Sequence, residues 1–350
     1  MNNKIVVNGR FLTQKSTGVQ RVATEISKHL QEHYKEGIVF VCPNKPILNP
    51  VGESLNCIKT GYFSGYFWEQ IELPFFLFKN KVSRLINFCN TAPILFKKNV
   101  IVIHDMAVKE NKNWFDWKFA FVYNILFYFN LKSALKIITV SNFSKNEILK
   151  FYPNIQQSKI EVIYLASFFS FAEERNQKAD YFIAVNSLNS RKNINVILEA
   201  FKLLDSNQYR LKIIGDSFNK VFKNDIIEHG LNVEFLNDVS DAELKKEVSE
   251  AKALINASFY EGFGLSALEA MSVSTPCILS NIPVYRELYK ETALFFDPKN
   301  PLELAQKIKD LKGLENYNDL CKRSFEASQK FSWKMASAQY IAIIENLKNK

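Results

Sequence analysis

The sequence has few of the features that mark a secreted, zinc-binding or membrane-spanning protein. Its five cysteines are scattered without paired spacing, which argues for a reducing compartment and against a zinc site. The apolar run at the N-terminus is too short for a signal peptide, so we expect no cleaved leader. No uncharged apolar run reaches the roughly 18 residues of a membrane span. Internal repeats and low-complexity tracts are also absent.

The composition is that of a globular protein with two domains. Of 350 residues, 47% are hydrophobic and 23% are charged, which leaves enough apolar mass for two cores. The charge is uneven. Residues 1–170 carry 21 Lys and Arg against 11 Asp and Glu, whereas residues 171–350 carry 24 against 25. A basic first half attracts anionic lipid, nucleic acid or a phosphorylated ligand, although a merely solvated surface is an alternative.

Short, continuous apolar runs alternate with helical patterns along the chain. Continuous rather than alternating hydrophobicity is typical of strands that are buried on both faces of a parallel sheet. The pattern predicts an α/β protein with doubly wound parallel sheets. The expected strands lie at 5–7, 38–41, 100–103, 137–140, 162–164, 181–185, 211–215, 233–236, 253–257 and 277–280, and the expected helices include 20–33, 142–151 and 193–204.

A polar, irregular stretch separates two such series of strands and helices. We therefore predict a first domain at 1–168, a linker at 169–179, a second domain at 180–330 and a C-terminal helix within 331–350. Two such domains place a ligand between the carboxyl ends of their strands.

The strongest local signal is the segment 258–271, Ser-Phe-Tyr-Glu-Gly-Phe-Gly-Leu-Ser-Ala-Leu-Glu-Ala-Met. A strand ends before it, and a helix is expected to begin near Leu265. Amide groups at a helix start can bind an anion, and the glycines Gly262 and Gly264 let backbone approach a ligand. Glu261 and Glu269 supply carboxylates, of which the second can accept hydrogen bonds from a ribose diol. An ordinary strand–turn–helix favoured by the helix dipole explains one of these glutamates but not both.

This segment resembles the retaining glycosyltransferases of the GT-B fold, family 4. The resemblance implies two Rossmann-like domains that face each other across a cleft. It implies that Glu261 lies at the sugar ring near the anomeric carbon and that Glu269 holds the ribose hydroxyls. The turn residues Gly262, Phe263, Gly264 and Leu265 would also bind the donor.

Three further segments extend the resemblance. In Arg191-Lys192-Asn193, the lysine would bind the donor diphosphate, and Arg191 stands beside it, while Ser187 replaces an arginine that many relatives have. His104, at the end of a buried strand, would face the donor sugar and join Glu261 and Lys192 in catalysis. Gly18 opens a helix as in the family's first glycine loop, with a Thr17 or Ser16 cap as the alternative explanation. Val239 lies in the segment that resembles the nucleobase contact, and the C-terminal helix after Ser332 would cross back onto the first domain.

The implied reaction is hexosyl transfer from a nucleoside-diphosphate sugar with retention of configuration. No Asp-x-Asp triplet occurs, which departs from the metal-dependent glycosyltransferases, and we expect neither metal nor cofactor. Mannose or a deoxyhexose such as rhamnose is the favoured sugar, with a GDP- or dTDP-linked donor.

The basic first half is where the acceptor is expected, as a lipid-linked glycan or an oligosaccharide in O-antigen, capsule or exopolysaccharide synthesis. The aromatic segment 114–129 indicates either a buried helix, which we favour, or a contact with anionic membrane. We expect a cytoplasmic protein at the inner face of a bacterial plasma membrane, without a nucleic-acid partner.

Two other classes remain as alternatives. Gly262–Ala267 fits the Gly-x-Gly-x-x-Ala pattern of an NAD-dependent dehydrogenase, but Ser280-Asn281 stands where that pattern expects an acidic residue. A non-catalytic, two-domain binding protein for a sugar or sugar nucleotide shares the architecture, although a periplasmic receptor needs a signal peptide.

Overall fold

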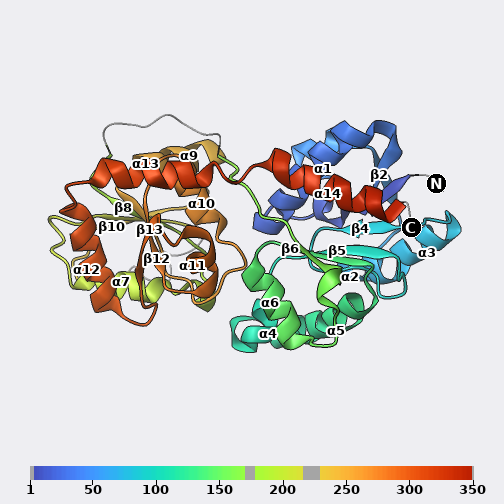
Figure 1. Cartoon of the computed structure of the whole chain (residues 1–350), viewed down its shortest axis with the longest axis horizontal. Coiled ribbons are helices and arrows are strands. Elements are labelled where there is room, and N and C mark those ends of the chain that lie inside the picture. The colour runs from blue at the N-terminus through green and yellow to red at the C-terminus, as the bar shows by residue number, and fades with distance from the viewer. Residues whose placement is uncertain (1–3, 170–177, 216–228, 349–350) are drawn as a thin grey trace. The chain divides into compact units, whose positions relative to one another are not determined.

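The computed structural model describes residues 4–169, 178–215 and 229–348 and divides the chain into two compact units (Figure 1). The first unit contains Met1–Leu165 and Ser332–Lys350, and the second contains Ala166–Phe331. The first unit's continuous stretch thus ends at Leu165, where the sequence indicated 168. Most of the predicted linker, 170–177, lies outside the described residues.

The first unit is built on a sheet of seven parallel strands in the order β3-β2-β1-β4-β5-β6-β7. The order reverses direction at β1, because β2 pairs with one side of β1 and β4 with the other. That reversal is the switch point at which doubly wound sheets bind ligands. The strands are β1 (Ile5–Asn8), β2 (Ile38–Pro43), β3 (Cys57–Thr60), β4 (Leu85–Asn87), β5 (Asn99–Ile103), β6 (Lys136–Thr139) and β7 (Ile160–Val162).

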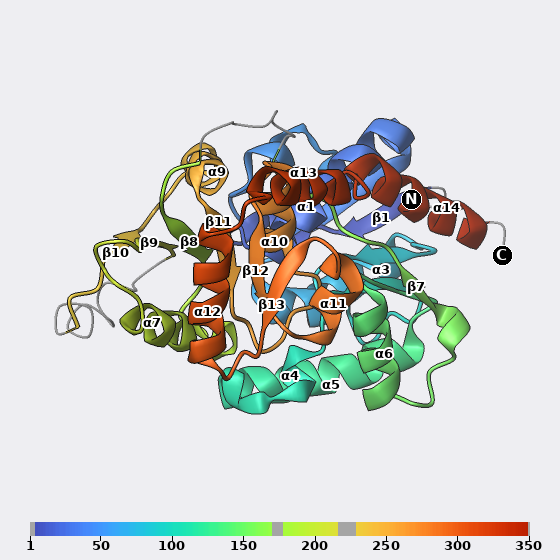
Figure 2. The same cartoon turned by 60° about the vertical axis from the view of Figure 1, so that its left-hand side comes forward.

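Helices cover both faces of this sheet (Figures 1 and 2). On one face, α1 (Gly18–Tyr34) packs against the C-terminal helix α14 (Trp333–Lys348). Tyr340 of α14 is buried and meets the Phe88 ring edge-on, with 5.8 Å between centroids. The other face carries α3 (Leu73–Lys79), α5 (Trp117–Ser133) and α6 (Asn142–Phe151), and the short helices are α2 (Gly65–Phe67) and α4 (Ala107–Glu110).

The second unit has a sheet of six parallel strands in the order β10-β9-β8-β11-β12-β13. Helices α7 and α12 pack together against it, and α10 packs with α13. The strands are β8 (Phe182–Val185), β9 (Leu211–Ile214), β10 (Val233–Leu236), β11 (Ala253–Asn256), β12 (Cys277–Ser280) and β13 (Ala293–Phe296). The helices are α7 (Ile194–Lys202), α9 (Asp241–Glu250), α10 (Leu265–Ser272), α11 (Pro283–Tyr289), α12 (Pro301–Lys312) and α13 (Tyr317–Ser328).

Two doubly wound parallel sheets were predicted, and both are present. The sequence pattern missed β3, β4 and β13. β4 has only three residues, and β3 at the sheet edge is only half-buried and contains Lys59, so neither forms a continuous apolar run of ordinary strand length. β13 pairs with β12 at the other sheet's edge and is mostly half-buried.

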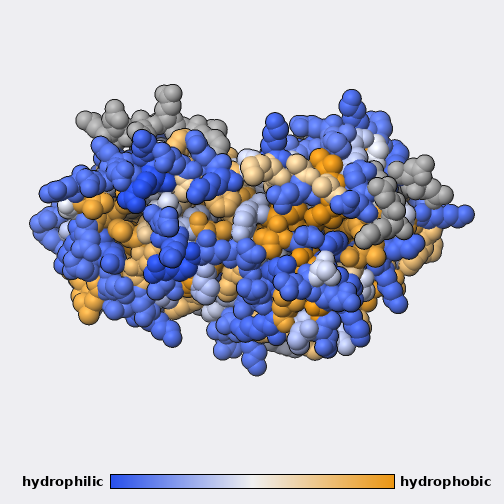
Figure 3. All heavy atoms as spheres, viewed as in Figure 1, coloured by the Kyte–Doolittle hydropathy of each residue, from blue (hydrophilic) through white to orange (hydrophobic). Residues whose placement is uncertain are grey.

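The aromatic segment forms α5, which is not the fully buried helix that the composition favoured. Leu126, Phe127 and Leu131 are buried, whereas Trp117 and Phe121 are 71% and 61% exposed. Apolar residues also reach the surface elsewhere on the first unit, as Figure 3 shows in orange for one face. Among the described residues, no helix combines the length and apolar character needed to cross a bilayer.

Candidate active site

The segment 258–271 lies at the carboxyl end of β11 and runs into α10. Gly264 is the N-cap residue of α10 and has φ 88°, in the left-handed region that glycine adopts without strain. A Cβ at Gly264 would overlap the Tyr285 ring of α11. No side chain caps the helix at this residue, so its first amides are not satisfied from a side chain, as an anion-binding helix start requires.

Glu261 lies in this turn and is the centre of a buried ionic cluster. Its Oε1 accepts hydrogen bonds from Lys192 Nζ at 2.6 Å and from Ser258 Oγ at 2.7 Å. Its Oε2 lies 3.2 Å from Arg191 Nη1. We call these four residues the Glu261 cluster. Lys192 and Glu261 are about seventy residues apart in the chain. The structure thus brings together two segments that were predicted separately from the sequence.

The electrostatics of the cluster keep Glu261 ionised. Burial by itself would raise the pKa of the Glu261 carboxyl, but the charges of Lys192 and Arg191 and the hydrogen bonds from Lys192 and Ser258 outweigh burial and lower it to about 2. Glu261 is therefore a carboxylate at neutral pH and cannot act there as a proton donor.

Arg191 and Lys192 lie in a tight 3-10 turn, Ser190–Lys192, just before α7. Asn193 follows in a left-handed conformation, and its Nδ2 donates to Ala257 O at 3.1 Å and to Pro298 O at 2.7 Å. These bonds fix the turn against the end of β11. Arg191 Nη1 also donates to Tyr260 O at 2.5 Å. The positive charges of Arg191 and Lys192 at the start of α7 oppose the helix dipole, and the Glu261 carboxylate compensates them.

Arg191 and Lys192 remain partly exposed to solvent although both are paired with Glu261. The side chains of Arg191 and Lys192 are 15% and 20% exposed, whereas the Glu261 side chain is 11% exposed. A ligand with negative charge can therefore approach the two cations, which makes this cluster suitable for a diphosphate.

The other predicted donor residues of the second unit fall around the same strand ends. Glu269 is buried on α10, one turn after the helix start. Phe263 is buried and meets Phe331 edge-on at 5.6 Å between ring centroids. Gly262 and Leu265 flank the turn, and Val239 is half-buried in the loop between β10 and α9.

His104 and Gly18 belong to the first unit. His104 follows β5, is 6% exposed, and its Nε2 lies 2.8 Å from Phe88 O. Because a carbonyl only accepts, this nitrogen carries the ring proton. Burial lowers the pKa of His104, and the bond to Phe88 and the charge of Asp105 only partly offset this effect. Gly18 is the exposed first residue of α1, where Thr17 is the N-cap residue but makes no side-chain cap bond.

Sequence reasoning missed two residues of the site. Ser258 donates to Glu261, and its position three residues before the glutamate in the same segment was the available signal. Tyr285 fills the space beside Gly264, and no local pattern indicated it, since the contact is made between two helices. Within the ranges 4–169, 178–215 and 229–348, no three His, Cys, Asp or Glu side chains gather as a metal site would need.

Comparison with known proteins agrees with this architecture. Residues 167–330 match the family model described as glycosyl transferases group 1. The O-antigen chain mannosyltransferase RfbU of Salmonella typhimurium is 32% identical over 233 residues, which cover 64% of this chain and 64% of that protein. The O-antigen chain mannosyltransferase B of Escherichia coli is 28% identical over 233 residues, or 61% of each chain. The matches thus span less than two thirds of these relatives.

Solved structures show the same fold over the whole chain. WaaG, a glycosyltransferase involved in lipopolysaccharide biosynthesis, has a TM-score of 0.76 at 14% identity, covering 97% of this chain and 99% of that one. Anabaena HepE in complex with UDP and glucose has a TM-score of 0.75 at 14% identity, covering 99% and 100%. The chain therefore has the GT-B fold, and its residues 167–330 match the glycosyl transferases group 1, in agreement with the resemblance. Membership in family 4 is compatible with these findings.

Proposed function

We propose that this protein is a hexosyltransferase that moves a sugar from a nucleoside-diphosphate donor to an acceptor hydroxyl. The observation that carries the proposal is the Glu261 cluster, in which Lys192 and Arg191 converge beside an uncapped helix start inside the family-matched range. A diphosphate leaving group develops negative charge, and two cations held in advance stabilise it without reorganisation.

The chemistry follows from the charges of the cluster. The acceptor oxygen bonds to the anomeric carbon, the bond from that carbon to the donor phosphate oxygen breaks, and the diphosphate leaves with the bonding electrons. Lys192 and Arg191 stabilise that charge. The acceptor proton passes to a donor phosphate oxygen on the same face of the sugar. Because the acceptor attacks on the face from which the diphosphate leaves, the configuration at the anomeric carbon is retained.

Glu261 suits an electrostatic role better than a nucleophilic one. Its carboxylate accepts hydrogen bonds from Lys192 and Ser258 and forms an ion pair with Arg191. Each of these interactions lowers the reactivity of the carboxylate toward carbon. Its negative charge instead favours the positive charge that builds on the sugar ring, as in other glycosyl transfers. Attack from the leaving-group face therefore fits the cluster better than a covalent intermediate on Glu261.

The relatives favour mannose as the sugar, since RfbU and the Escherichia coli protein are both described as O-antigen chain mannosyltransferases. We extend this to a GDP-linked donor and a lipid-linked or oligosaccharide acceptor of a surface polysaccharide. The basic first half and its exposed aromatic residues support peripheral contact with anionic membrane on the cytoplasmic side. Roles for His104 and Gly18 at the donor remain predictions from the resemblance.

The decisive test is a panel of nucleotides in a thermal-shift assay without added metal. GDP, UDP, dTDP, ADP and NAD are each added to the wild type, to Glu269→Gln and to a control, Glu199→Gln, on the exposed face of α7. A ligand that binds the folded protein raises its melting temperature. We expect GDP or dTDP to do so in the wild type and the control, and much less in Glu269→Gln.

A stabilisation by NAD alone would instead favour the dehydrogenase alternative. Nucleotide binding without any sugar transfer to lipid-linked acceptors would favour the non-catalytic binding protein. Repeating the assay with EDTA and with Mg²⁺ tests metal independence, and the anomeric configuration of the product, measured by NMR, tests retention.

A further inference from the structure

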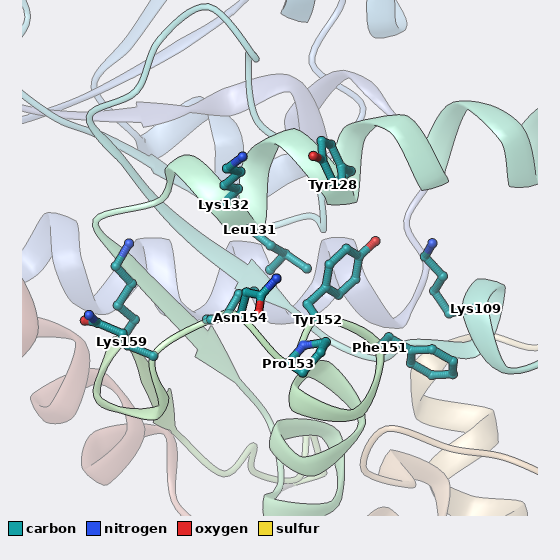
Figure 4. A pocket seen from close by; sticks show the side chains of 11 residues that line it. Lys109, Tyr128, Leu131, Lys132, Phe151, Tyr152, Pro153, Asn154 and Lys159 are labelled. Atoms are coloured by element: carbon teal, nitrogen blue, oxygen red, sulfur yellow. The ribbon is translucent and has the colours of Figure 1, made fainter.

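The first unit contains a pocket that the proposed transfer reaction does not use. It has a volume of about 520 Å³ and lies between α5 and the loop that follows α6 (Figure 4). Both α5 and α6 end here, next to the beginnings of β6 and β7, whereas His104 follows the carboxyl end of β5. The pocket is therefore formed mainly by the ends of α5 and α6, and Lys109 reaches it from α4, which follows β5.

The pocket has a cationic rim and apolar walls. Its ionisable lining consists of Lys109, Lys132 and Lys159 together with two tyrosines, and no carboxylate lines it. Rings and aliphatic side chains form the remaining walls, with Phe151, Pro153 and Leu131 among them. A ligand that fits this lining carries negative charge next to an apolar group.

The three lysines lack negative partners, whereas the acidic residues nearby are already paired. Glu110 and Glu147 both bind Lys150, at 2.9 and 3.2 Å, and Glu161 binds Lys136 at 2.6 Å. In the described part of the chain, no carboxylate forms an ion pair with any of the three pocket lysines. Partial burial without a counter-charge lowers the pKa of Lys109. The positive charge of the pocket is thus uncompensated by any carboxylate of the described residues.

A buried hydroxyl without a partner lies in the same pocket. Tyr152 Oη is shielded from solvent, yet it makes no hydrogen bond within the described residues. Such a group destabilises a folded protein unless something accepts its proton. Figure 4 shows this hydroxyl directed toward the space between Tyr128 and Lys109, and Lys109 Nζ lies 5.3 Å from the Tyr152 ring centroid.

The pocket also continues an exposed apolar stripe of α5. Trp117, Phe121, Ile125 and Tyr128 follow helical spacing on one side of the helix and are 71%, 61%, 39% and 50% exposed. Tyr128 belongs to both the stripe and the pocket, and Lys132 lies one turn further along the same side. An apolar chain attached to a bound anion would therefore have a surface to follow.

We propose that this pocket binds a phosphate ester whose neighbouring group is apolar. The phosphate is paired with Lys109, Lys132 and Lys159. Movement of the Lys109 side chain, which lies over the Tyr152 ring, toward the phosphate uncovers Tyr152 Oη, and this hydroxyl then donates a hydrogen bond to the phosphate. The chemistry is shared by a phospholipid headgroup and by a soluble organic phosphate, and the α5 stripe suits the lipid. This site is independent of the nucleotide-binding cluster of the second unit.

The test measures binding of defined probes to the full chain. Titration calorimetry measures the binding of two soluble probes, sn-glycerol 3-phosphate and dihexanoyl phosphatidic acid. Dihexanoyl phosphatidylcholine is the zwitterionic control. Vesicles of phosphatidylcholine with and without phosphatidic acid, followed by co-sedimentation, form the membrane arm. We expect the short-chain phosphatidic acid to bind more tightly than glycerol phosphate, and phosphatidic acid vesicles to retain the protein.

Two variants locate the site. Tyr152→Phe keeps the ring and removes only the unpaired hydroxyl, so it should fold at least as stably as the wild type and bind phosphatidic acid roughly 10-fold more weakly. The triple variant Lys109→Gln, Lys132→Gln, Lys159→Gln should lose measurable binding. Its charge-matched control replaces the exposed Lys79, Lys97 and Lys98 of the same unit by Gln and should bind as the wild type does.

The outcomes separate the sources and can overturn the proposal. Equal affinity for glycerol phosphate and phosphatidic acid would show that an apolar neighbouring group contributes nothing, which overturns that part of the proposal and leaves a soluble phosphate as the ligand. A preference for the lipid would support the proposal and identify the headgroup. If the triple variant and its control lose binding equally, the attraction is diffuse charge and no pocket site exists. The stabilisation by a nucleoside diphosphate should survive in every variant, so a failure here leaves the proposed transferase function untouched.

Discussion

Two buried glutamates, one in each unit, are held by cations in different ways. In the first unit, Glu69 is 1% exposed and binds Arg10 at 3.2 Å, together with Asn8 at 2.8 Å and Thr91 at 3.1 Å. In the second unit, Glu261 binds Lys192, Arg191 and Ser258. The side chain of Arg10 is only 5% exposed, but those of Arg191 and Lys192 are 15% and 20% exposed.

The difference in exposure separates a structural ion pair from a candidate binding site. Arg10 Nη2 also donates to Thr91 Oγ1 at 3.0 Å, and the Arg10 guanidinium lies 4.6 Å from the Tyr66 ring centroid, so its surroundings are filled by the protein. A sealed pair of this kind ties the loop after β1 to the helical segment around Glu69. The cations beside Glu261 have solvent access, and a ligand can therefore reach them.

The largest effect is expected from breaking the sealed pair. Glu69→Ala leaves the Arg10 charge buried without a partner, which should lower the free energy of unfolding by about 3–5 kcal/mol. Urea unfolding measures the loss. The control is Glu161→Ala, whose pair with Lys136 is half-exposed and should contribute less than about 1 kcal/mol. Similar losses in the two variants would contradict the structural role of Glu69.

Removing a cation from the open cluster should affect the reaction more than the fold. Lys192→Met should lower kcat by about 10²–10³-fold, the usual size for losing one group that stabilises transition-state charge. Its unfolding free energy should fall less than that of Glu69→Ala, because Arg191 and Ser258 still bind Glu261. Lys202→Met on α7 is the matched control. A stability loss as large as that of Glu69→Ala would make Lys192 structural.

Acid should weaken the second unit through Glu261. Its pKa is about 2 in the folded protein against an ordinary 4.5, so the folded state favours the carboxylate. The resulting stability, on the order of 3 kcal/mol, is complete above pH 4.5 and is lost as the pH falls toward 2. Urea midpoints measured over this range should fall less steeply in Glu261→Gln than in the wild type. If the urea midpoints of Glu261→Gln and the wild type fall in parallel, groups other than Glu261 cause the loss of stability in acid.

The smallest effect is the backbone strain at Gly264, in the turn that carries Glu261. Gly264→Ala places a side chain at φ 88° and against the Tyr285 ring, and the backbone strain alone should lower stability by about 1–2 kcal/mol. Adding Tyr285→Leu should relieve the overlap but not the backbone strain. Thermal unfolding of the single and double variants separates the two contributions, and an unchanged melting temperature in Gly264→Ala would contradict both.

Much of the second unit could be predicted because its signals are local. Glu261, Gly262 and Gly264 lie within four residues, and a turn between a buried strand and a helix is a short-range feature. Lys192 was predicted from the resemblance of its own short segment. The first unit was harder, because β4 and β3 are short or half-exposed and give no apolar run.

By itself, the sequence determined the two doubly wound sheets and the glycine turn, because apolar periodicity and turn chemistry act over a few neighbours. Only the tertiary structure decided which charges meet. The pairing of Lys192 with Glu261, the sealing of Arg10 against Glu69 and the unpaired Tyr152 hydroxyl among three lysines join residues from separate elements. Packing of those elements sets their burial, and burial decides whether a charge is structural or open to a ligand.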